Sequence, residues 1–373
     1  MKMDLKNMRN SKVGSLLTIY FVIRVISFST FWVAAHFRHR HFLTIFARWD
    51  AQWYESIAQN GYGFSVVEKG QVHSNEAFFP LFPILEKFVH ELSHLGLLTS
   101  GVLISVICGG WATVMIFKIT EVLTNSNIAL ITSFLWIIYP IAYVDNLAYS
   151  ETLFTALVAT TLYCWHRAAI KSATLFAFLA GLTRPTGLAL VVAIAIPAIY
   201  EMATNPRSRR SFSYNFAIFA SGSGWLAYIL YLSHKNNNLF SYFSVQSNWG
   251  NGLDGGRHFL IWISNYLFSR NWYLGILLLM ALALGLYLLV GLYKSTQFAP
   301  ILIFATLLFI LTFSTQGYFG SKARYLLPDF PLLIPIAVSI KNMKRRDKFI
   351  ALGLLSLLGL TFGAIAATGH GPP

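Results

Sequence analysis

Long apolar stretches recur along the whole chain, and several are long enough to cross a lipid bilayer as a helix. A hydrocarbon core of about 30 Å is crossed by about 20 helical residues. Since lipid cannot satisfy exposed backbone groups, runs of this kind favour helices. The apolar stretches lie at about 13–35, 101–123, 128–144, 151–166, 172–183, 187–200, 212–232, 271–293, 298–314, 326–340 and 349–367. The sequence therefore predicts an all-α polytopic membrane bundle of about 11 spans.

The composition excludes several other classes of protein. Only 11% of the 373 residues are charged and 56% are hydrophobic, whereas about a quarter of an ordinary soluble domain is charged. A disordered chain, a coiled coil and a soluble nucleic-acid binder are therefore excluded. No internal repeat, low-complexity tract or linker is visible, so we expect one integral-membrane domain over residues 1–373. Cys108 and Cys164 lie in apolar runs and indicate no disulfide framework.

The net charge of +14 is unevenly divided between the loops. If the N-terminus lies inside and the spans alternate, the short inside loops hold most basic residues, as the positive-inside rule requires. These residues are Lys2, Lys6, Arg9, Lys12, Arg167, Lys171, Arg207, Arg209, Arg210, Lys294, Lys341, Lys344, Arg345, Arg346 and Lys348. The large loops 36–100 and 233–270 then lie outside, with most carboxylates. We expect a multi-pass protein of a bacterial inner membrane or the endoplasmic reticulum, with a cytoplasmic N-terminus and an outer or luminal active site. Its charge is not explained by a nucleic-acid partner.

The turn at Arg184-Pro185 is interpreted as the meeting point of two short spans. Pro185 breaks a helix. If 172–200 were one crossing, the basic loop around Arg209 would move outside and every later loop would invert. A shallow re-entrant hairpin is the alternative.

The first outer loop begins with a segment, 46–62, that predicts a helix lying along the membrane. Trp49, Trp53 and Ile57 recur at every fourth residue and share one face. Asp50 stands at the start of this helix. It is either an N-cap that accepts backbone N–H bonds, or a carboxylate at the membrane boundary that acts as a general base on a hydroxyl. One carboxylate can serve both roles.

Two further parts of this loop have a recognisable character. Glu76 precedes Pro80 and Pro83, which forbid a regular helix interior and indicate a shaped loop. It is either a site residue or an ordinary surface carboxylate. Residues 84–95 then predict an amphipathic helix with Glu86 on its polar face, which suits the bilayer surface or another protein surface.

Two motifs have weaker implications. His36, His39 and His41 alternate with arginines and match no strong zinc pattern, so they indicate a basic segment next to the membrane. The glycine-rich loop 248–258 follows no strand and is not a nucleotide-binding motif. It is either a flexible lid or a flexible connection.

Charged residues return where later spans reach the outer face. Asp145 and Glu151 lie between two spans, and acids near a membrane are costly enough to suggest function by default. Arg184, Lys322 and Arg324 suit a phosphate, which Arg binds bidentately and Lys as a point charge. Each group has a structural alternative. Asp145 and Glu151 are then a loop acid and part of a capped helix start, and Arg184 pairs with one of them. Lys322 and Arg324 then contact lipid headgroups.

Several blocks together resemble the PIG-V family, which comprises the GPI mannosyltransferase 2 group and its bacterial relatives. The blocks occur in the family's order between about residues 15 and 340. They are Arg48-Trp49-Asp50-Ala51-x-Trp53-Tyr54, Glu76-Ala77-Phe78-Phe79-Pro80-Leu81-x-Pro83, Tyr149-Ser150-Glu151, Thr183-Arg184-Pro185-x-Gly187 and Arg324-Tyr325. The resemblance implies a GT-C fold with a catalytic first outer loop and a donor that carries its sugar on a polyprenyl or dolichyl phosphate.

The resemblance also implies that Asp50 is the catalytic base. We expect Glu76 to orient the acceptor or the arginines, and four residues to bind the donor phosphate: Arg324, Lys322, Arg184 and Tyr325. The expected substrate-binding residues are Trp49, Trp53, Tyr54, Glu151 and Asp145.

The expected reaction is transfer of a hexose, mannose by the resemblance, to a lipid or glycan acceptor by one inverting displacement. No Asp-x-Asp pattern surrounds Asp50, so we expect no catalytic metal, and no cofactor is expected. Membrane lipids surround the protein, and a protein partner is not indicated. The alternatives are a transporter or flippase of lipid-linked saccharides, which usually has repeated halves, and a non-enzymatic assembly factor.

Overall fold

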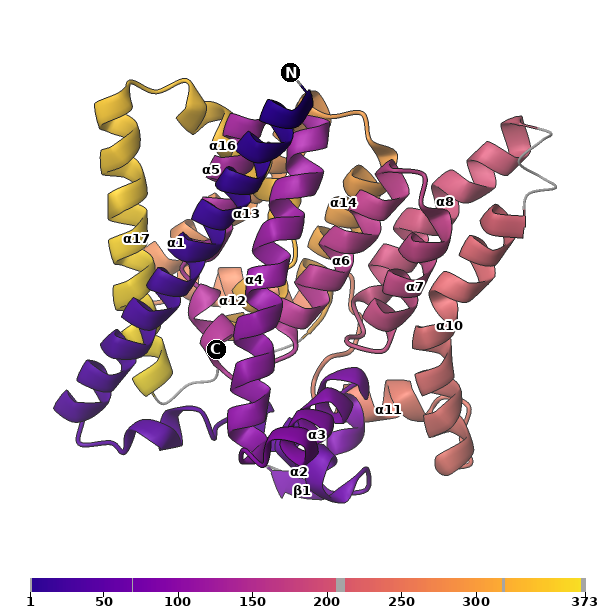
Figure 1. Ribbon diagram of the computed structural model, residues 1–373. Helices are drawn as coiled ribbons and strands as arrows, with labels where there is room; N and C mark the ends of the chain where they lie inside the picture. Colours follow the sequence, from indigo (N-terminus) through magenta and orange to yellow (C-terminus); the bar gives the residue numbers. More distant parts are fainter. Residues whose placement is uncertain (1, 69, 206–211, 317–318, 370–373) are drawn as a thin grey trace.

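The computed structural model describes residues 2–68, 70–205, 212–316 and 319–369, and it is a bundle of helices (Figure 1). Arg207, Arg209 and Arg210 lie outside the described residues. The apolar helices are α1 (Lys2–Phe37), α4 (Leu97–Leu123), α5 (Ser126–Ile138), α6 (Glu151–His166), α7 (Ile170–Gly181), α8 (Gly187–Thr204), α10 (Phe212–Lys235), α13 (Trp272–Ser295), α14 (Ala299–Ser314), α16 (Leu333–Lys341) and α17 (Arg345–Thr368). Each overlaps a predicted apolar stretch, although α5 and α16 are shorter than the stretches 128–144 and 326–340, and six of the helices are long and apolar enough to cross a membrane. The prediction of an all-α polytopic bundle is confirmed.

The remaining elements are short and connect these helices. They are η1 (Phe42–Ile45), α2 (Asp50–Asn60), β1 (Ser65–Glu68), β2 (Gln71–Ser74), η2 (Asn75–Ala77), α3 (Leu81–Ser93), η3 (Ala142–Asn146), α11 (Ser241–Asn248), α12 (Arg257–Leu267), η4 (Phe319–Ser321), α15 (Lys322–Tyr325) and η5 (Phe330–Leu332). The antiparallel hairpin of β1 and β2 was not predicted, because four-residue strands are too short to show a clear alternation.

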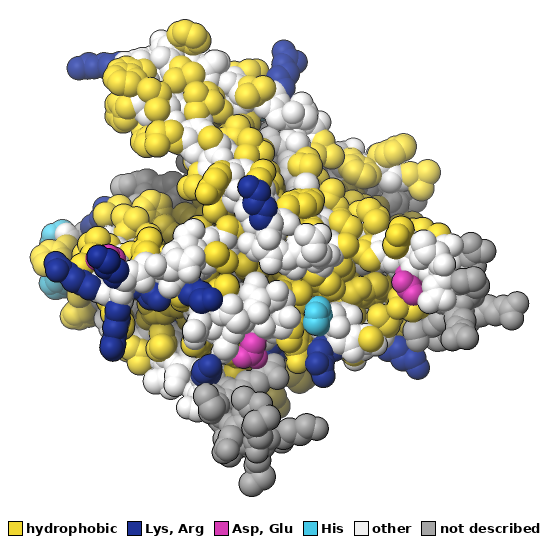
Figure 2. Space-filling view, turned by 90° about the horizontal axis from the view of Figure 1, so that it is seen from above, with side chains coloured by type: hydrophobic (Ala, Val, Ile, Leu, Met, Phe, Trp, Pro, Cys, Tyr) yellow, Lys and Arg dark blue, Asp and Glu magenta, His cyan; other side chains and the backbone are white. Residues whose placement is uncertain are grey.

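Those loops predicted to lie inside that the structure describes gather at one end of the bundle, where α1 begins. Lys12 Nζ donates to Ser126 Oγ at 2.8 Å, and the His166 ring lies 5.3 Å from the Phe298 ring. Figure 2 looks onto this end and shows scattered Lys and Arg side chains with few carboxylates. The alternation of spans therefore has the expected arrangement, while the side of the membrane that this end faces stays a prediction.

The first outer loop lies at the opposite end, where α2, α3, β1 and α11 are grouped (Figure 1). The C-terminal ends of α1 and α17 meet here, since Arg38 donates to the Thr368 carbonyl at 3.0 Å. The turn between α7 and α8 also reaches this end, because Leu81 N donates to the Leu182 carbonyl at 2.9 Å. The prediction that two short helices meet in a turn is confirmed.

The helices α5 and α6 stop short of this end, and the buried segment η3 connects them. Their free backbone groups need partners within the protein, because lipid supplies none. Arg24 of α1 donates to the carbonyls of Ile137 and Ala142, both at 2.7 Å. Asp145 of η3 lies 3.6 Å from the same guanidinium. Arg24 therefore holds the connection between α5 and α6 against α1.

The amphipathic helix α3 departs from its predicted pattern at one position. Ile84, Phe88 and Leu92 are exposed, as expected of a helix on a bilayer surface, but Glu86 is fully buried. Its carboxyl packs against Gly101 of α4, where a Cβ atom would lie 2.6 Å from Glu86 Oε1. Burial raises the pKa of Glu86 to about 9, so the carboxyl is neutral at pH 7. The polar-face prediction was wrong here because an uncharged carboxyl can be buried.

We expect Gly101→Ala to lower the free energy of unfolding by about 1–3 kcal/mol, because the added methyl group overpacks this contact. Gly353→Ala is the matched control, since no atom lies within 4 Å of the position of its Cβ. Thermal unfolding of both variants in detergent measures the difference. Equal stabilities would mean that α3 and α4 do not pack as described.

Candidate active site

Asp50 is the first residue of α2, and the backbone before it is strained. Trp49 has φ 54° and ψ −126°, a conformation that is unfavourable for a residue with a Cβ atom. Trp49, rather than Asp50, occupies the cap position, so the N-cap interpretation of Asp50 is wrong. Asp50 Oδ2 instead accepts a hydrogen bond from Arg324 Nη1 at 2.7 Å. Its side chain is 22% exposed, and Oδ1 has no hydrogen-bond partner among the described residues.

Arg324 of α15 links Asp50 to a second carboxylate. Its Nε lies 3.3 Å from Glu151 Oε1, and its guanidinium lies 5.1 Å and 5.5 Å from the ring centres of Tyr149 and Tyr325. Burial acts to lower the pKa of Arg324. The negative charges of Asp50 and Glu151 outweigh burial and raise this pKa well above its ordinary value. The guanidinium is therefore permanently charged and fixed in place.

Glu151 begins α6 and is fully buried. Its Oε1 lies 2.6 Å from Arg184 Nη1, so Arg184 pairs with Glu151, as one of the predicted alternatives has it. Arg184 also donates to Ser150 Oγ at 3.1 Å, and Tyr54 is hydrogen-bonded to the same oxygen at 2.7 Å. Ser150 makes no side-chain cap to α6, because its hydroxyl serves this network instead.

Two carboxylates and two guanidiniums thus alternate in the order Asp50, Arg324, Glu151, Arg184. Their formal charges cancel, and the low dielectric of a buried site strengthens each attraction. Only Asp50, at one end of the row, is partly exposed. Asp50 is therefore the member of the row that can accept a proton. Once Asp50 is protonated, the row has a net positive charge that can stabilise an anion.

Glu76 belongs to a different group of residues. Its Oε1 lies 2.9 Å from Lys235 Nζ, and Asn236 Nδ2 donates to its Oε2 at 2.9 Å. Lys235 is the last residue of α10, and Asn236 follows it. The structure therefore uses Glu76 to join the first outer loop to α10 and does not bring it into contact with Asp50.

Lys322 also lies apart from the predicted phosphate-binding group. Its Nζ donates to the carbonyls of Thr312 and Thr315 at 2.8 Å and 2.7 Å, so it caps the C-terminal end of α14. Burial lowers the pKa of Lys322 to about 8. Asp145 likewise has a structural partner, Arg24.

Trp53 lies in an aromatic cluster next to the ion pairs. Its indole stacks on Phe78 at 6.0 Å and meets the edge of Trp249 at 5.0 Å. Trp249 Nε1 donates to the Ser74 carbonyl at 2.9 Å. The glycine-rich loop is therefore attached to the first outer loop. The sequence singled out this loop but not Trp249, because a lone aromatic residue carries no spacing signal.

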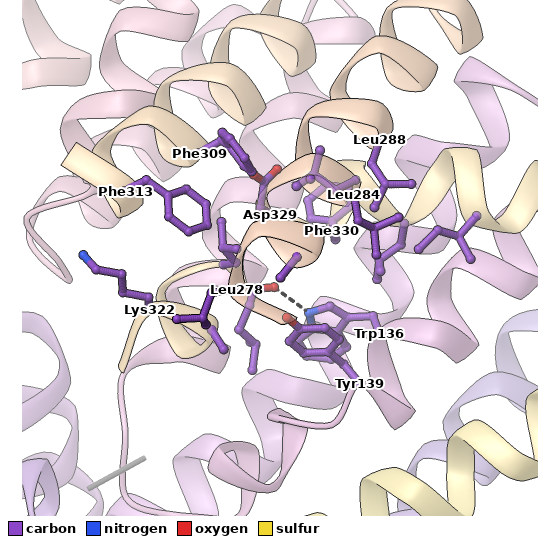
Figure 3. Close-up of a pocket in the computed structure, with 18 of the residues that line it drawn as sticks. Trp136, Tyr139, Leu278, Leu284, Leu288, Phe309, Phe313, Lys322, Asp329 and Phe330 are labelled. Carbon is purple, nitrogen blue, oxygen red and sulfur yellow. Dashed lines mark hydrogen bonds between the residues drawn. The ribbon is translucent and has the colours of Figure 1, made fainter. Parts of the chain in front are cut away.

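A cavity of about 350 Å³ adjoins α15 (Figure 3). Side chains of α13 and α14 line it. Trp136 also lines it and donates from Nε1 to the Leu327 carbonyl at 3.0 Å. Asp329 also lines the cavity, and neither of its carboxylate oxygens has a hydrogen-bond partner among the described residues. Burial raises the pKa of Asp329 well above its ordinary value. Lys322, Tyr139 and Trp136 are the other lining residues with polar side-chain atoms, and the rest of the lining is apolar, which suits an apolar ligand.

No group of three or more His, Cys, Asp or Glu side chains that could hold a metal ion occurs in the described parts of the chain.

Residues 76–234 match the family model described as dolichyl-phosphate-mannose-protein mannosyltransferase. No curated protein matches the chain. Among solved structures, the chain is similar to ArnT from Cupriavidus metallidurans bound to undecaprenyl phosphate, with a TM-score of 0.59 and 14% identity over 96% of this chain and 66% of ArnT. It is also similar to the oligosaccharyltransferase AglB from Archaeoglobus fulgidus in complex with an inhibitory peptide and a dolichol-phosphate. There the TM-score is 0.51 and the identity 13%, over 96% of this chain and 56% of AglB.

These similarities establish the fold alone, because the identities are low and the chain spans only 66% of ArnT and 56% of AglB. The bundle is the GT-C polytopic membrane fold that the sequence blocks implied. The narrower resemblance to the PIG-V family is not confirmed, because the matching family model is a different one.

We expect Glu151→Gln to lower the free energy of unfolding by about 3–5 kcal/mol, because it removes a buried charge that two guanidiniums share. Glu91→Gln is the control. It breaks the exposed Lys87–Glu91 pair (4.0 Å) and should cost less than about 1 kcal/mol. Chemical unfolding in detergent compares the two variants. A loss in Glu151→Gln no larger than in the control would contradict a shared buried counter-ion.

Proposed function

We propose that the protein is a membrane glycosyltransferase that moves a hexose from a polyprenyl- or dolichyl-phosphate donor to a lipid or glycan acceptor. The observation that carries this proposal is the partly exposed Asp50, held through one oxygen by Arg324 and open at the other. The matching family is described by a dolichyl-phosphate-mannose donor, which supports mannose as the sugar. Two proteins of the same fold have been solved with undecaprenyl phosphate and with a dolichol-phosphate, which supports a lipid-phosphate donor.

In the proposed reaction, Asp50 Oδ1 accepts the proton of an acceptor hydroxyl as its oxygen attacks the anomeric carbon. The bond from that carbon to the lipid phosphate breaks, and its electron pair leaves with the phosphate. One displacement of this kind inverts the anomeric centre. A positioned general base contributes roughly 10²–10⁴ to such a rate.

The ion pairs couple the two ends of this step. Arg324 shares its charge between Asp50 and Glu151 before the reaction. When Asp50 takes up the proton, it loses its charge, and the net charge of the row rises by one as the leaving phosphate becomes more negative. Arg324, with Arg184 and Tyr325 beside it, can then stabilise that phosphate.

The cavity offers a place for the lipid chain of the donor. α15 presents Arg324 to the carboxylates, while Ala323 and Leu326 line the cavity. A lipid whose phosphate meets Arg324 can therefore place part of its chain among the side chains of α13 and α14. We further propose that this end of the bundle faces the outer or luminal side, because the opposite end holds the basic loops.

Asp50→Asn should lower kcat by about 10²–10⁴-fold with a smaller effect on donor binding, because an amide cannot take the proton. The assay follows transfer of radiolabelled mannose from polyprenyl phosphate by the full-length protein. Glu91→Gln, which is exposed on α3, should retain full turnover. Wild-type turnover by folded Asp50→Asn would exclude Asp50 as the base. Movement of the intact lipid-linked sugar across vesicles without release of polyprenyl phosphate would instead indicate a flippase.

Ala281→Phe should raise KM for a long-chain donor by about tenfold and leave a donor with one or two isoprene units unaffected, because the ring fills the cavity. Leu354→Phe, on an exposed position of α17, is the matched control. Equal effects on long and short donors would place the lipid chain elsewhere.

A further inference from the structure

Tyr149 has no role in the reaction proposed above, although it contacts both members of the Asp50–Arg324 pair. Its hydroxyl oxygen accepts a hydrogen bond from Asp50 N at 3.3 Å. The centre of its ring lies 5.1 Å from the Arg324 guanidinium. Tyr149 is only 1% exposed, so packing fixes the position of its ring. One buried side chain therefore touches the two groups on which the proposed reaction depends.

The hydrogen bond to Asp50 N satisfies a group that α2 itself leaves without a partner. The first N–H groups of a helix have no acceptor within the helix. The usual acceptor is the side chain of the cap residue, but Trp49 holds that position in α2 and makes no side-chain cap. Tyr149, which lies 99 residues further along the chain, supplies the acceptor instead. The start of α2 is therefore capped by a distant segment of the protein.

The strained backbone before Asp50 makes this contact more important. Trp49 has φ 54° and ψ −126°, and such a conformation persists only where the surrounding structure fixes it. A relaxation at Trp49 would turn the start of α2 and move the Asp50 carboxylate relative to Arg324. Because Tyr149 holds the next N–H group along the chain, its hydroxyl opposes that relaxation.

Tyr149 is itself attached to a long helix of the bundle. Ser105 Oγ of α4 donates to the Tyr149 carbonyl at 3.0 Å and accepts from Tyr149 N at 3.3 Å. The next residue, Ser150, is hydrogen-bonded through Oγ to Tyr54, one turn along α2, at 2.7 Å. α2 is thus held at its start and one turn later, and Tyr149 is the residue that touches Asp50.

We propose that Tyr149 is a positioning residue for the transfer reaction. Its hydroxyl holds the first N–H group of α2, and its ring lies against Arg324, so that Asp50 keeps Oδ2 on the guanidinium and Oδ1 open. The effect on catalysis rests on the proposed function, whereas the hold on α2 does not. A catalytic group that is misplaced by about 1 Å can lose about 10²-fold in rate. Tyr149 acts through Asp50 and needs no contact with substrate.

The first test measures the hold on α2 without turnover. Tyr149→Phe removes the hydroxyl and keeps the ring. Tyr20→Phe is the matched control, because Tyr20 is also buried and its hydroxyl donates to one backbone group, the Val106 carbonyl, at 2.9 Å. Hydrogen–deuterium exchange of the full-length protein in detergent should be faster at the start of α2 in Tyr149→Phe and unchanged there in Tyr20→Phe. Exchange at the wild-type rate in folded Tyr149→Phe overturns the proposal.

The second test measures transfer of mannose from polyprenyl phosphate. Tyr149→Phe should lower kcat by about 10–100-fold and change KM for the donor by less than about threefold, because the base is displaced while donor binding is kept. Tyr20→Phe should keep the wild-type kcat. Each variant loses one hydrogen bond, so thermal unfolding should show similar losses of stability in the two. Wild-type kcat in Tyr149→Phe, or an equal loss in the control, contradicts the positioning role.

A double variant distinguishes action through Asp50 from a general weakening of the site. If the hydroxyl acts through the base, adding Tyr149→Phe to Asp50→Asn should lower the residual rate by less than about twofold. A loss as large as in the wild-type background overturns the proposal, because Tyr149 would then act independently of Asp50.

The outcomes also separate this inference from the proposed function. If wild type transfers no sugar, the proposed function and the catalytic part of this inference both fail, and exchange still decides whether Tyr149 holds α2. If wild type transfers sugar and only kcat of Tyr149→Phe is unaffected, the positioning role alone is wrong. Should Tyr149→Phe not fold, Ser105→Ala replaces it, since it frees the backbone of Tyr149. It should raise the same exchange and lower kcat, and no effect on either contradicts the proposal.

Discussion

One buried carboxylate, Glu151, determines how the functional end of the bundle is assembled. It brings together Arg184 from the turn between α7 and α8 and Arg324 from α15, and through Arg324 it positions Asp50 of α2. An unpaired charge in this interior would be very costly, so the four segments have to meet. Glu151 is the first residue of α6, and Arg184 lies in the turn that follows α7, so these two helix ends meet at the shared charges.

The short helix α15 lies at the boundary between the charged residues around Glu151 and the cavity. α15 carries Arg324 toward the carboxylates, whereas Leu326 faces the apolar cavity. Lys322, two residues before Arg324, is satisfied by the end of α14 rather than by an anion. A charged headgroup and an apolar chain can thus meet at one short helix, which is the geometry that a lipid-phosphate donor requires.

Much of this end could be predicted from the sequence, but the partners of its residues could not. The sequence predicts Asp50, Glu151, Arg184 and Arg324 as site residues, and the structure brings them together. It also predicts Glu76, which lies in the same outer loop as Asp50, yet Glu76 joins a separate group at the end of α10. Charge at a span end indicates depth in the membrane, and it contains no information about which neighbouring helix faces it.

The sequence by itself determined the spans, their alternation and the two ends of the bundle, because hydrophobic length and loop charge act locally along the chain. Only the tertiary structure decided that Glu86 and Asp329 are buried carboxyls. Those outcomes depend on which segments pack together. Glu86 is buried next to a glycine, and Asp329 is buried where it lines the cavity. A hydrophobicity pattern treats each as a surface charge, because it does not show that the carboxyl can be buried in its neutral form.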